Sequence, residues 1–255
     1  MNRVVNINKG RLMIVNDLHG DINDYKQVKM IFLKLLEAGE ADYLVFNGDV
    51  IHAYAGEDCS VEMLDDIIKM IKEHPGKIIY LLGNHEFVHV YGLALHKGGL
   101  EFTGHFKQDA GDKLLEYVNF FKSLAFAIRT KGGILICHNG AADIDYSPGM
   151  LDDFEHKEEL KEVLWEMLMN KNEFQYGTER YKSYLNKALN VFNARFMITG
   201  HIPCEKGFEV VLGEQLRVNS GYGAGKSKKR YLIVDGEKSY IDINGLLSGV
   251  KHLYL

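Results

Sequence analysis

Cysteine and proline are both scarce in this chain of 255 residues, with three of each. Cys59, Cys137 and Cys204 form no spaced framework, so a secreted scaffold held by disulfides is not expected. The few prolines, and the lack of any repeat, low-complexity tract or linker, favour one compact domain over residues 1–255. A chain of this length can bury a sizeable core. We therefore expect reduced thiols and a cytoplasmic protein.

Long apolar runs and an excess of positive charge are also missing. No run approaches ~18 apolar residues, and the first residues, MNRVVNINKGRL, lack the apolar segment of a signal peptide. The net charge of −5 argues against broad binding to nucleic acid or to an anionic membrane. We expect no membrane partner, and the oligomeric state stays open.

The first third of the chain alternates between two apolar patterns. Short apolar runs that end in polar residues predict strands at 11–16, 42–49 and 77–84. Helical periodicity separates these runs, first through Val28, Ile31, Phe32, Leu35 and Leu36, and then through Val61, Leu64, Ile67, Ile68 and Ile71. Asp21, Asn23 and Asp24 precede the first helix, as a helix N-terminus prefers. The order β-α-β-α-β favours a parallel sheet covered by helices.

The rest of the chain continues less regularly. Residues 87–130 contain several glycines and histidines, and we expect a cap or insertion there. Further strands are expected at 132–140 and 194–203, with helices between them. The last fifty residues contain short apolar runs with turn signals, which predict antiparallel strands.

Each predicted strand ends in residues that bind metals. The strand ends carry Asp17 and His19, Asp49, Asn84 and His85, His138, and His201. Ligands of open α/β sheets bind at the carboxyl ends of the strands, so we expect these side chains to converge. Carboxylate, imidazole and amide ligands suit Mn, Fe or Zn. Asp49, flanked by two groups of ligands, is placed to bridge two metals, which can clamp the oxygens of an in-line phosphoryl displacement.

Local spacing refines this expectation. Asp17 and His19, two residues apart on an extended segment, would point in the same direction. Asn84 and His85 are adjacent and would diverge, so that one holds metal while the other faces a substrate. Glycines at 20, 48, 83 and 200 would let the backbone turn sharply or approach the site closely.

A competing interpretation comes from His85-Glu86-Phe87-Val88-His89, which matches the H-E-x-x-H pattern of zinc peptidases. That pattern needs a helix that places both histidines on one face. Glycines at 83 and 92 and β-branched residues at 88 and 90 make this segment a poor helix centre. The peptidase interpretation also leaves the other metal-binding residues without a role, so we disfavour it.

The series NDLHGD, NGD, GNHE, HNG and GH resembles the motifs of calcineurin-like metallophosphoesterases. Within that superfamily it is similar to the phosphoprotein phosphatase branch, which includes bacterial diadenosine tetraphosphatases. The resemblance covers about residues 11–225 and rests on the order and spacing of all five motifs. It implies a four-layer α/β/β/α sandwich of two mixed sheets flanked by helices. It also implies a metal-dependent phosphoesterase with a phosphorylated substrate.

The resemblance assigns a role to each strand-end residue. Asp17, His19 and Asp49 would hold one divalent metal, and Asp49, Asn84, His138 and His201 the other. His85 would protonate the leaving group, and a water between the metals would be the nucleophile. Mn is the metal that we expect to support activity in vitro.

The second motif departs from the family. His52-Ala53-Tyr54 stands where the family has Asp-Arg-Gly, so the carboxylate that orients the catalytic histidine and the phosphate-binding arginine are both replaced. Arg180 is the candidate replacement for that arginine, and Lys226, in the basic run at 226–230, is a further candidate for contact with an anionic substrate. His89, His96 and His105 are expected at the surface or in the cap.

Several functions stay open. The substrate would be a phosphomonoester, such as a phosphoprotein, or a dinucleoside polyphosphate or phosphodiester. The altered motif also allows a catalytically silent metal-binding module. Residues 220–227, SGYGAGKS, nearly match a phosphate-binding loop, but no strand–loop–helix context surrounds them, so we do not expect a nucleoside triphosphate site.

Overall fold

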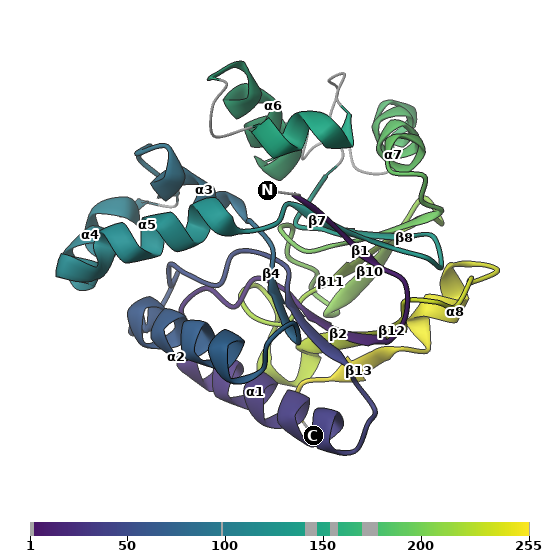
Figure 1. Ribbon diagram of the computed structural model, residues 1–255, viewed down its shortest axis with the longest axis horizontal. Helices are drawn as coiled ribbons and strands as arrows, with labels where there is room; N and C mark the ends of the chain where they lie inside the picture. The colour runs from purple at the N-terminus through teal and green to yellow at the C-terminus, as the bar shows by residue number, and fades with distance from the viewer. Residues whose placement is uncertain (1–2, 98, 141–146, 154–157, 170–177, 255) are drawn as a thin grey trace.

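The protein is described by a computed structural model that covers residues 3–97, 99–140, 147–153, 158–169 and 178–254. Two mixed sheets stack face to face (Figure 1). The six-stranded sheet has the order β1 (Val4–Ile7), β7 (Ala127–Thr130), β8 (Ile134–Cys137), β9 (Phe196–Thr199), β11 (Gln215–Val218) and β10 (Phe208–Val211). The five-stranded sheet has the order β13 (Val250–His252), β12 (Arg230–Asp235), β2 (Arg11–Val15), β3 (Tyr43–Phe46) and β4 (Ile78–Tyr80).

Helices cover the outer faces of both sheets (Figure 1). The five-stranded sheet is covered by α1 (Ile22–Glu37) and α2 (Ser60–Glu73), and the six-stranded sheet by α6 (Glu158–Met169) and α7 (Glu179–Val191). A short helix, α8 (Ile243–Leu247), precedes β13, and single 3-10 turns lie at 111–113, 148–153 and 226–228. The predicted four-layer α/β/β/α architecture is therefore confirmed. None of the described helices is long and apolar enough to cross a membrane.

Strand β2 shows why the fold has four layers. Its alternate residues Leu12 and Ile14 belong to the apolar cluster between the sheets, together with Ile136 of β8. Met13, on the other face, belongs with Phe32 of α1 to the cluster between sheet and helices. Successive side chains of a strand point to opposite faces, so a strand that is apolar throughout can be buried on both sides.

Helix α1 begins directly after the loop that carries the predicted ligands Asp17 and His19. The side chain of Asp21 accepts hydrogen bonds from the backbone N–H groups of Asn23 and Asp24, at 2.9 and 3.2 Å. This cap satisfies donors that the first helical turn leaves without partners. Asp21 precedes the helix as expected, whereas Asn23 and Asp24 lie in its first turn. The cap fixes the end of the loop that carries Asp17 and His19.

The region after β4 is mostly helical. It contains α3 (Asn84–Val90), the hairpin of β5 (His96–Lys97) and β6 (Leu100–Glu101), α4 (Thr103–Ala110) and α5 (Leu114–Ser123). Helix α3 packs against α5, and this part lies at one side of the sandwich (Figure 1). The end of the range 87–130 is strand β7, which belongs to the six-stranded sheet. That the remainder acts as a cap stays a prediction.

The expectation that residues 84–90 are not helical is wrong. The Glu86 carboxylate accepts the backbone N–H of Gly83 at 3.1 Å and so caps the start of α3. Phe87 and Val88 are fully buried. A β-branched residue costs a helix only ~0.7 kcal/mol or less, whereas burying an apolar side chain contributes about 1.5–3 kcal/mol. Tertiary packing therefore outweighs the weak helix propensity of the segment.

Candidate metal centre

The predicted metal-binding residues meet at the carboxyl ends of strands from both sheets. Loops after β2, β3, β8 and β9 supply Asp17 and His19, Asp49, His138 and His201, and the first turn of α3, which follows β4, supplies Asn84 and His85. All but the partly buried His201 are at most 6% exposed. All of them except His138 line a cavity of about 20 Å³, which is space for about one water molecule. The meeting of two sheet edges produces the site.

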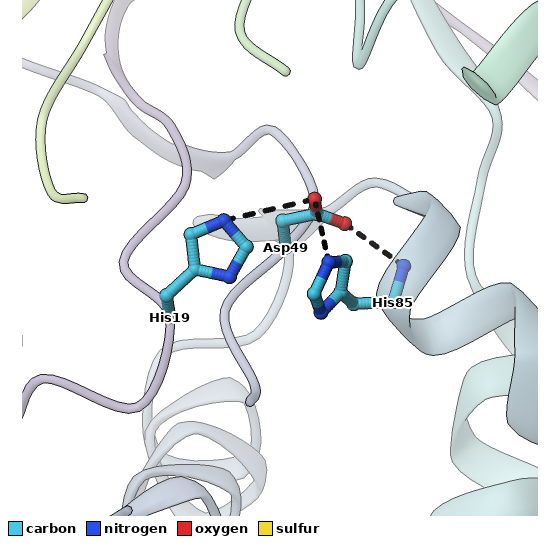
Figure 2. Close-up of side chains that lie close together, drawn as sticks. All are labelled: His19, Asp49 and His85. Atoms are coloured by element: carbon cyan, nitrogen blue, oxygen red, sulfur yellow. Dashed lines mark hydrogen bonds and ion pairs between the residues drawn. The ribbon is translucent and has the colours of Figure 1, made fainter. Parts of the chain in front are cut away.

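Asp49 occupies the centre of the site. Its Oδ2 atom lies 3.3 Å from His138 Nε2, 3.8 Å from His19 Nε2 and 3.9 Å from His85 Nε2. Figure 2 shows the carboxylate between the rings of His19 and His85. Two groups of side chains lie close enough together to hold a metal ion. The first is His19, Asp49 and His85, the second is Asp49, His138 and His201, and Asp49 belongs to both.

The second group surrounds the ring of His138. Its Nε2 atom lies 2.9 Å from Asn84 Oδ1 and 3.2 Å from His201 Nδ1, in addition to the contact with Asp49. Ligands that each lie about 2.0–2.2 Å from one metal are separated from one another by roughly 3 Å. The distances from His138 Nε2 to the other three donor atoms therefore fit ligands of one cation.

Backbone carbonyls orient the three predicted histidine ligands. A carbonyl oxygen can only accept, so the ring nitrogen beside it carries the hydrogen and the other nitrogen offers its lone pair. The pairs are His19 Nδ1 with Ile51 O at 3.3 Å, His138 Nδ1 with Asn47 O at 3.0 Å, and His201 Nε2 with Met169 O at 3.1 Å. The other ring nitrogen is the one that faces the site. His19 Nε2 and His138 Nε2 lie near Asp49 Oδ2, and His201 Nδ1 lies near His138 Nε2.

Asp17 lines the cavity but its loop differs from the expected geometry. Asp17 and His19 have φ angles of 54° and 46°, so the segment is not extended and the expected i, i+2 alignment is wrong. The loop turns because its backbone N–H groups donate to the carbonyls of Gly48 and Asp49. The Asp17 carboxylate accepts the backbone N–H of His201 at 3.0 Å. A Cβ atom on Gly200 would lie 2.2 Å from Asp17 Oδ2, so only glycine fits there.

The electrostatics of the site favour cations. Burial raises the pKa of Asp17 to about 7. Burial also acts on Asp49, but the neighbouring rings of His138, His85 and His19 hold its pKa well below the usual value. His138 shows the reciprocal effect, because Asp49 outweighs burial and raises its pKa to about 9. Burial and the charge of His138 lower the pKa of His201 to about 3. Ionising both buried carboxylates thus requires more positive charge than the histidines supply.

Glu86 has a structural position rather than that of a peptidase base. Its carboxylate accepts hydrogen bonds from the backbone N–H groups of Asp49 and Val50 and from the hydroxyl of Tyr80, at 2.9, 3.0 and 2.8 Å. His85 and His89 do lie in one helix, as the peptidase pattern requires. The ring of His52 lies between them, however, so they do not converge on an open metal position.

His52 and His89 are the residues whose surroundings the sequence did not indicate. His89 was expected at the surface or in the cap but is only 4% exposed, and His52 is fully buried. His52 Nδ1 lies 3.0 Å from His85 Nδ1, and His52 Nε2 lies 2.8 Å from His89 Nε2. The three rings form a continuous row, and the hydroxyl of Tyr54 lies 3.2 Å from His85 Nε2 at its inner end.

Lys97 is a cation that lines the cavity, together with Tyr54 and Tyr222. The two tyrosine rings stack with their centroids 4.1 Å apart, and Lys97 Nζ lies 5.7 Å from the centroid of Tyr54. Sequence reasoning missed Lys97, because its only signal was its place in the irregular region after β4.

The two cations predicted to contact the substrate, Arg180 and Lys226, do not line this cavity. Lys226 Nζ lies 4.6 Å from the ring centroid of Tyr254 and lines a separate cavity. The guanidinium of Arg180, in α7, lies over the ring of Tyr184. Their substrate roles remain predictions.

Comparisons with known proteins agree with this architecture. The profile of the calcineurin-like phosphoesterase family matches residues 10–205. Shewanella-like protein phosphatase 1 of Plasmodium berghei (strain Anka) is 26% identical over 221 residues, which cover 75% of this chain and 61% of that protein. The chain thus spans about three fifths of the length of this curated relative.

Two solved structures share the fold. A protein serine/threonine phosphatase from Saccharomyces cerevisiae has a TM-score of 0.62 and 16% identity, over 91% of this chain and 76% of that one. A cold-active protein-tyrosine phosphatase from a psychrophilic Shewanella species has a TM-score of 0.61 and 17% identity, over 93% and 78%. Because the family profile spans most of the sequence, the chain belongs to the calcineurin-like phosphoesterase family, and its relatives fit the phosphoprotein phosphatase branch.

Proposed function

We propose that this protein is a metal-dependent phosphoesterase that hydrolyses phosphomonoesters. The observation that carries the proposal is the position of Asp49, whose Oδ2 atom lies within 3.3–3.9 Å of nitrogens from three histidines in a buried cavity. A shared carboxylate between two groups of nitrogen and oxygen donors is the arrangement that a two-metal hydrolase needs.

Family membership implies divalent metal ions, and the residues of the cavity fit them. Asp17, His19 and Asp49 would hold one ion, and Asp49, Asn84, His138 and His201 the other. When bound, such ions activate a water molecule and stabilise negative charge on phosphate oxygens. The mixed oxygen and nitrogen donors suit Mn, Fe or Zn, with Mn the first choice for assays.

His85 is the proposed general acid. Its backbone N–H donates to Asp49 Oδ1 at 3.0 Å, which holds the start of α3 against the metal loop. Its ring lines the cavity, with Nε2 directed toward Asp49 and Tyr54. From there Nε2–H would pass its proton to the oxygen of the leaving group, so that an alcohol or phenol departs in place of an alkoxide or phenolate.

The proposed substrate is a phosphorylated side chain of a protein or a small phosphomonoester. The relatives are named as protein phosphatases, of both the serine/threonine and the tyrosine type. Lys97 lines the cavity and is the proposed contact for phosphate oxygens. A dinucleoside polyphosphate or a phosphodiester is the alternative substrate within the same chemistry.

A catalytically silent metal-binding module is the second candidate. The replacement of the family Asp-Arg-Gly by His52-Ala53-Tyr54 favours it, because two groups that assist catalysis are missing. The placement of His85 on the cavity beside Asp49 argues for the enzyme.

One assay separates these functions. The purified protein is loaded with Mn and tested for turnover of p-nitrophenyl phosphate, bis-p-nitrophenyl phosphate and phosphorylated casein. With casein, the release of phosphate and the release of peptides are both measured. Asp49→Ala is the test variant and Asp112→Ala, at an exposed position, the matched control. Phosphate release that only Asp49→Ala abolishes supports the proposal. Peptide release abolished by His89→Ala, without ester turnover, contradicts it, and bound metal without any turnover favours the silent module.

A further inference from the structure

His85 has an imidazole partner where the resemblance leads one to expect a carboxylate. We infer that His52, held in place by His89, is the positioning residue for His85. This inference rests on the proposed function, in which His85 gives a proton to the leaving group. The inference adds His52 and His89 to the residues that support catalysis, and His89 lies outside the family motifs.

The contacts of His52 account for both of its ring nitrogens. Nδ1 faces His85 Nδ1 at 3.0 Å, and Nε2 faces His89 Nε2 at 2.8 Å. Each contact needs one N–H and one lone pair, because two lone pairs or two hydrogens would repel. A rotation of the His52 ring would break both contacts, so the row holds His85 in one orientation.

Aromatic side chains enclose this row. The ring of Phe102 stacks on His52, with centroids 5.4 Å apart and an interplanar angle of 20°. Phe106 contacts His52 and His89, at centroid distances of 5.6 and 4.6 Å. Rings packed in this way have little freedom to turn. The contacts that the structure gives to the ring nitrogens of His52 are both to imidazoles, and none is to a carboxylate among the described residues.

The backbone of His52 is also held in an unusual conformation. Its φ angle is 71°, in the left-handed region that residues other than glycine adopt uncommonly. Its N–H donates to Ser60 Oγ at 2.8 Å, which ties the loop to the start of α2. Strained conformations of this kind persist where the surroundings fix them, and they concentrate at functional sites.

The row gives a consistent arrangement of hydrogens for proton donation. When His85 carries hydrogen on both nitrogens, Nδ1–H donates to His52 Nδ1, and His52 Nε2–H donates to His89 Nε2. The Nε2–H bond of His85 then breaks as the O–H bond of the leaving group forms, and the P–O electron pair stays on the departing oxygen. His85 remains neutral and still donates Nδ1–H to His52. A water molecule forms the new bond to phosphorus as the bond to the leaving group breaks, and the proton that this water loses balances the one that His85 gives, so water is the one other reactant.

The outer end of the row is apolar. His89 Nδ1 is buried and has no hydrogen-bond partner among the described residues. The ring of Phe121 lies 6.0 Å from that of His89. The contact of Nε2 with His52 is thus the hydrogen bond that the structure gives to the ring of His89 among the described residues.

The chemistry of position 52 offers matched variants. Nδ1 of histidine and Oδ1 of asparagine are both bonded to Cγ, so His52→Asn keeps an acceptor for His85 and lacks any atom for His89. His52→Phe keeps the ring and its stacking on Phe102 and removes both nitrogens. His89→Phe removes only the outer contact.

The test is the turnover of p-nitrophenyl phosphate and phenyl phosphate by the Mn-loaded wild type and these variants. His52→Phe should lower kcat by on the order of 10–100-fold with KM and metal content unchanged. The loss should be larger with phenyl phosphate, because phenolate is more basic than p-nitrophenolate and depends more on the proton. His52→Asn should restore most of kcat, and His89→Phe should show a smaller loss with the same preference.

The outcomes separate this inference from the proposed function. A wild type that hydrolyses neither ester overturns the proposed function. An active wild type whose His52→Phe variant loses nothing, or loses the same factor on both esters, overturns the positioning role. Should His52→Phe not fold, as judged by circular dichroism, the comparison of His52→Asn and His89→Phe on the two esters decides in the same way.

Discussion

The carboxylate of Glu86 accepts the backbone N–H groups of Asp49 and Val50, at 2.9 and 3.0 Å. This contact joins the first turn of α3 to the loop that carries Asp49, the central carboxylate of the proposed metal site. It gives the Glu of the His-Glu-x-x-His match a role that has nothing to do with peptide hydrolysis. The metal loop and the helix of the proposed acid are thus held as one unit.

Glu86→Gln should destabilise this unit. Every group around the carboxylate is a donor, so the amide NH₂ of glutamine would face N–H or O–H groups without a partner. Leaving buried groups unsatisfied costs about 1–3 kcal/mol. Urea unfolding of Glu86→Gln should show that loss, whereas the exposed Glu73→Gln should behave as wild type. Equal midpoints for wild type and Glu86→Gln would contradict this account.

His85→Gln should separate catalysis from metal binding. Removing the proposed general acid should lower kcat by about 10²–10⁴-fold. Metal content, measured by elemental analysis, should stay at the wild-type level, because His85 is not among the proposed ligands. Loss of metal together with activity would instead make His85 a ligand, since its Nε2 lies 3.9 Å from Asp49 Oδ2.

Lys97→Ala should weaken substrate binding. A lysine that lines the cavity attracts phosphate oxygens, so its removal should raise KM for p-nitrophenyl phosphate more than it lowers kcat. Lys226→Ala and Arg180→Ala provide the comparison. If KM rose only in Lys226→Ala or only in Arg180→Ala, that residue, and not Lys97, would be the one that contacts the phosphate.

The stability of the metal-free protein should fall in mild acid because of His89. Burial, and then the charge of Lys107, lower the pKa of His89 from 6.5 to about 4. The unfolded chain binds the proton first, so the stabilisation from neutral His89 is present above pH 6.5 and is lost as the pH falls through about 4. The shift corresponds to about 3 kcal/mol.

Urea unfolding in EDTA between these two pH values measures that effect. The change in unfolding free energy should be smaller in His89→Phe than in wild type. Parallel profiles for the two proteins would show that His89 does not titrate in this range.

Sequence patterns predicted most of the fold, because the burial of a strand or helix decides which of its positions are apolar. The runs that became β2, β3, β4, β8 and β9 are apolar on both faces, as strands covered on two sides must be. Strands β1 and β7 were missed. They are four residues long and pair in parallel, Val4 opposite Ala127, so their pairing partner is not visible from local sequence.

The sequence predicted which residues line the candidate site, but it did not predict which other side chains contact them. The predicted ligands stand at strand ends, where the sheet edge alone brings them together. His52 and His89 meet across 37 residues, and Lys97 reaches the cavity from a short hairpin. Such contacts depend on how α3 and the residues after it pack, which no periodicity encodes.

The central claim of the proposed function is that Asp49 would be a ligand of divalent metal ions that support phosphoester hydrolysis. The most direct measurement combines elemental analysis with turnover of p-nitrophenyl phosphate for wild type and Asp49→Asn, both loaded with Mn and desalted. We expect the wild type to retain more than one metal ion per chain and to hydrolyse the ester, and Asp49→Asn to lose bound metal and turnover together. An Asp49→Asn variant with wild-type metal content and wild-type turnover would contradict the claim.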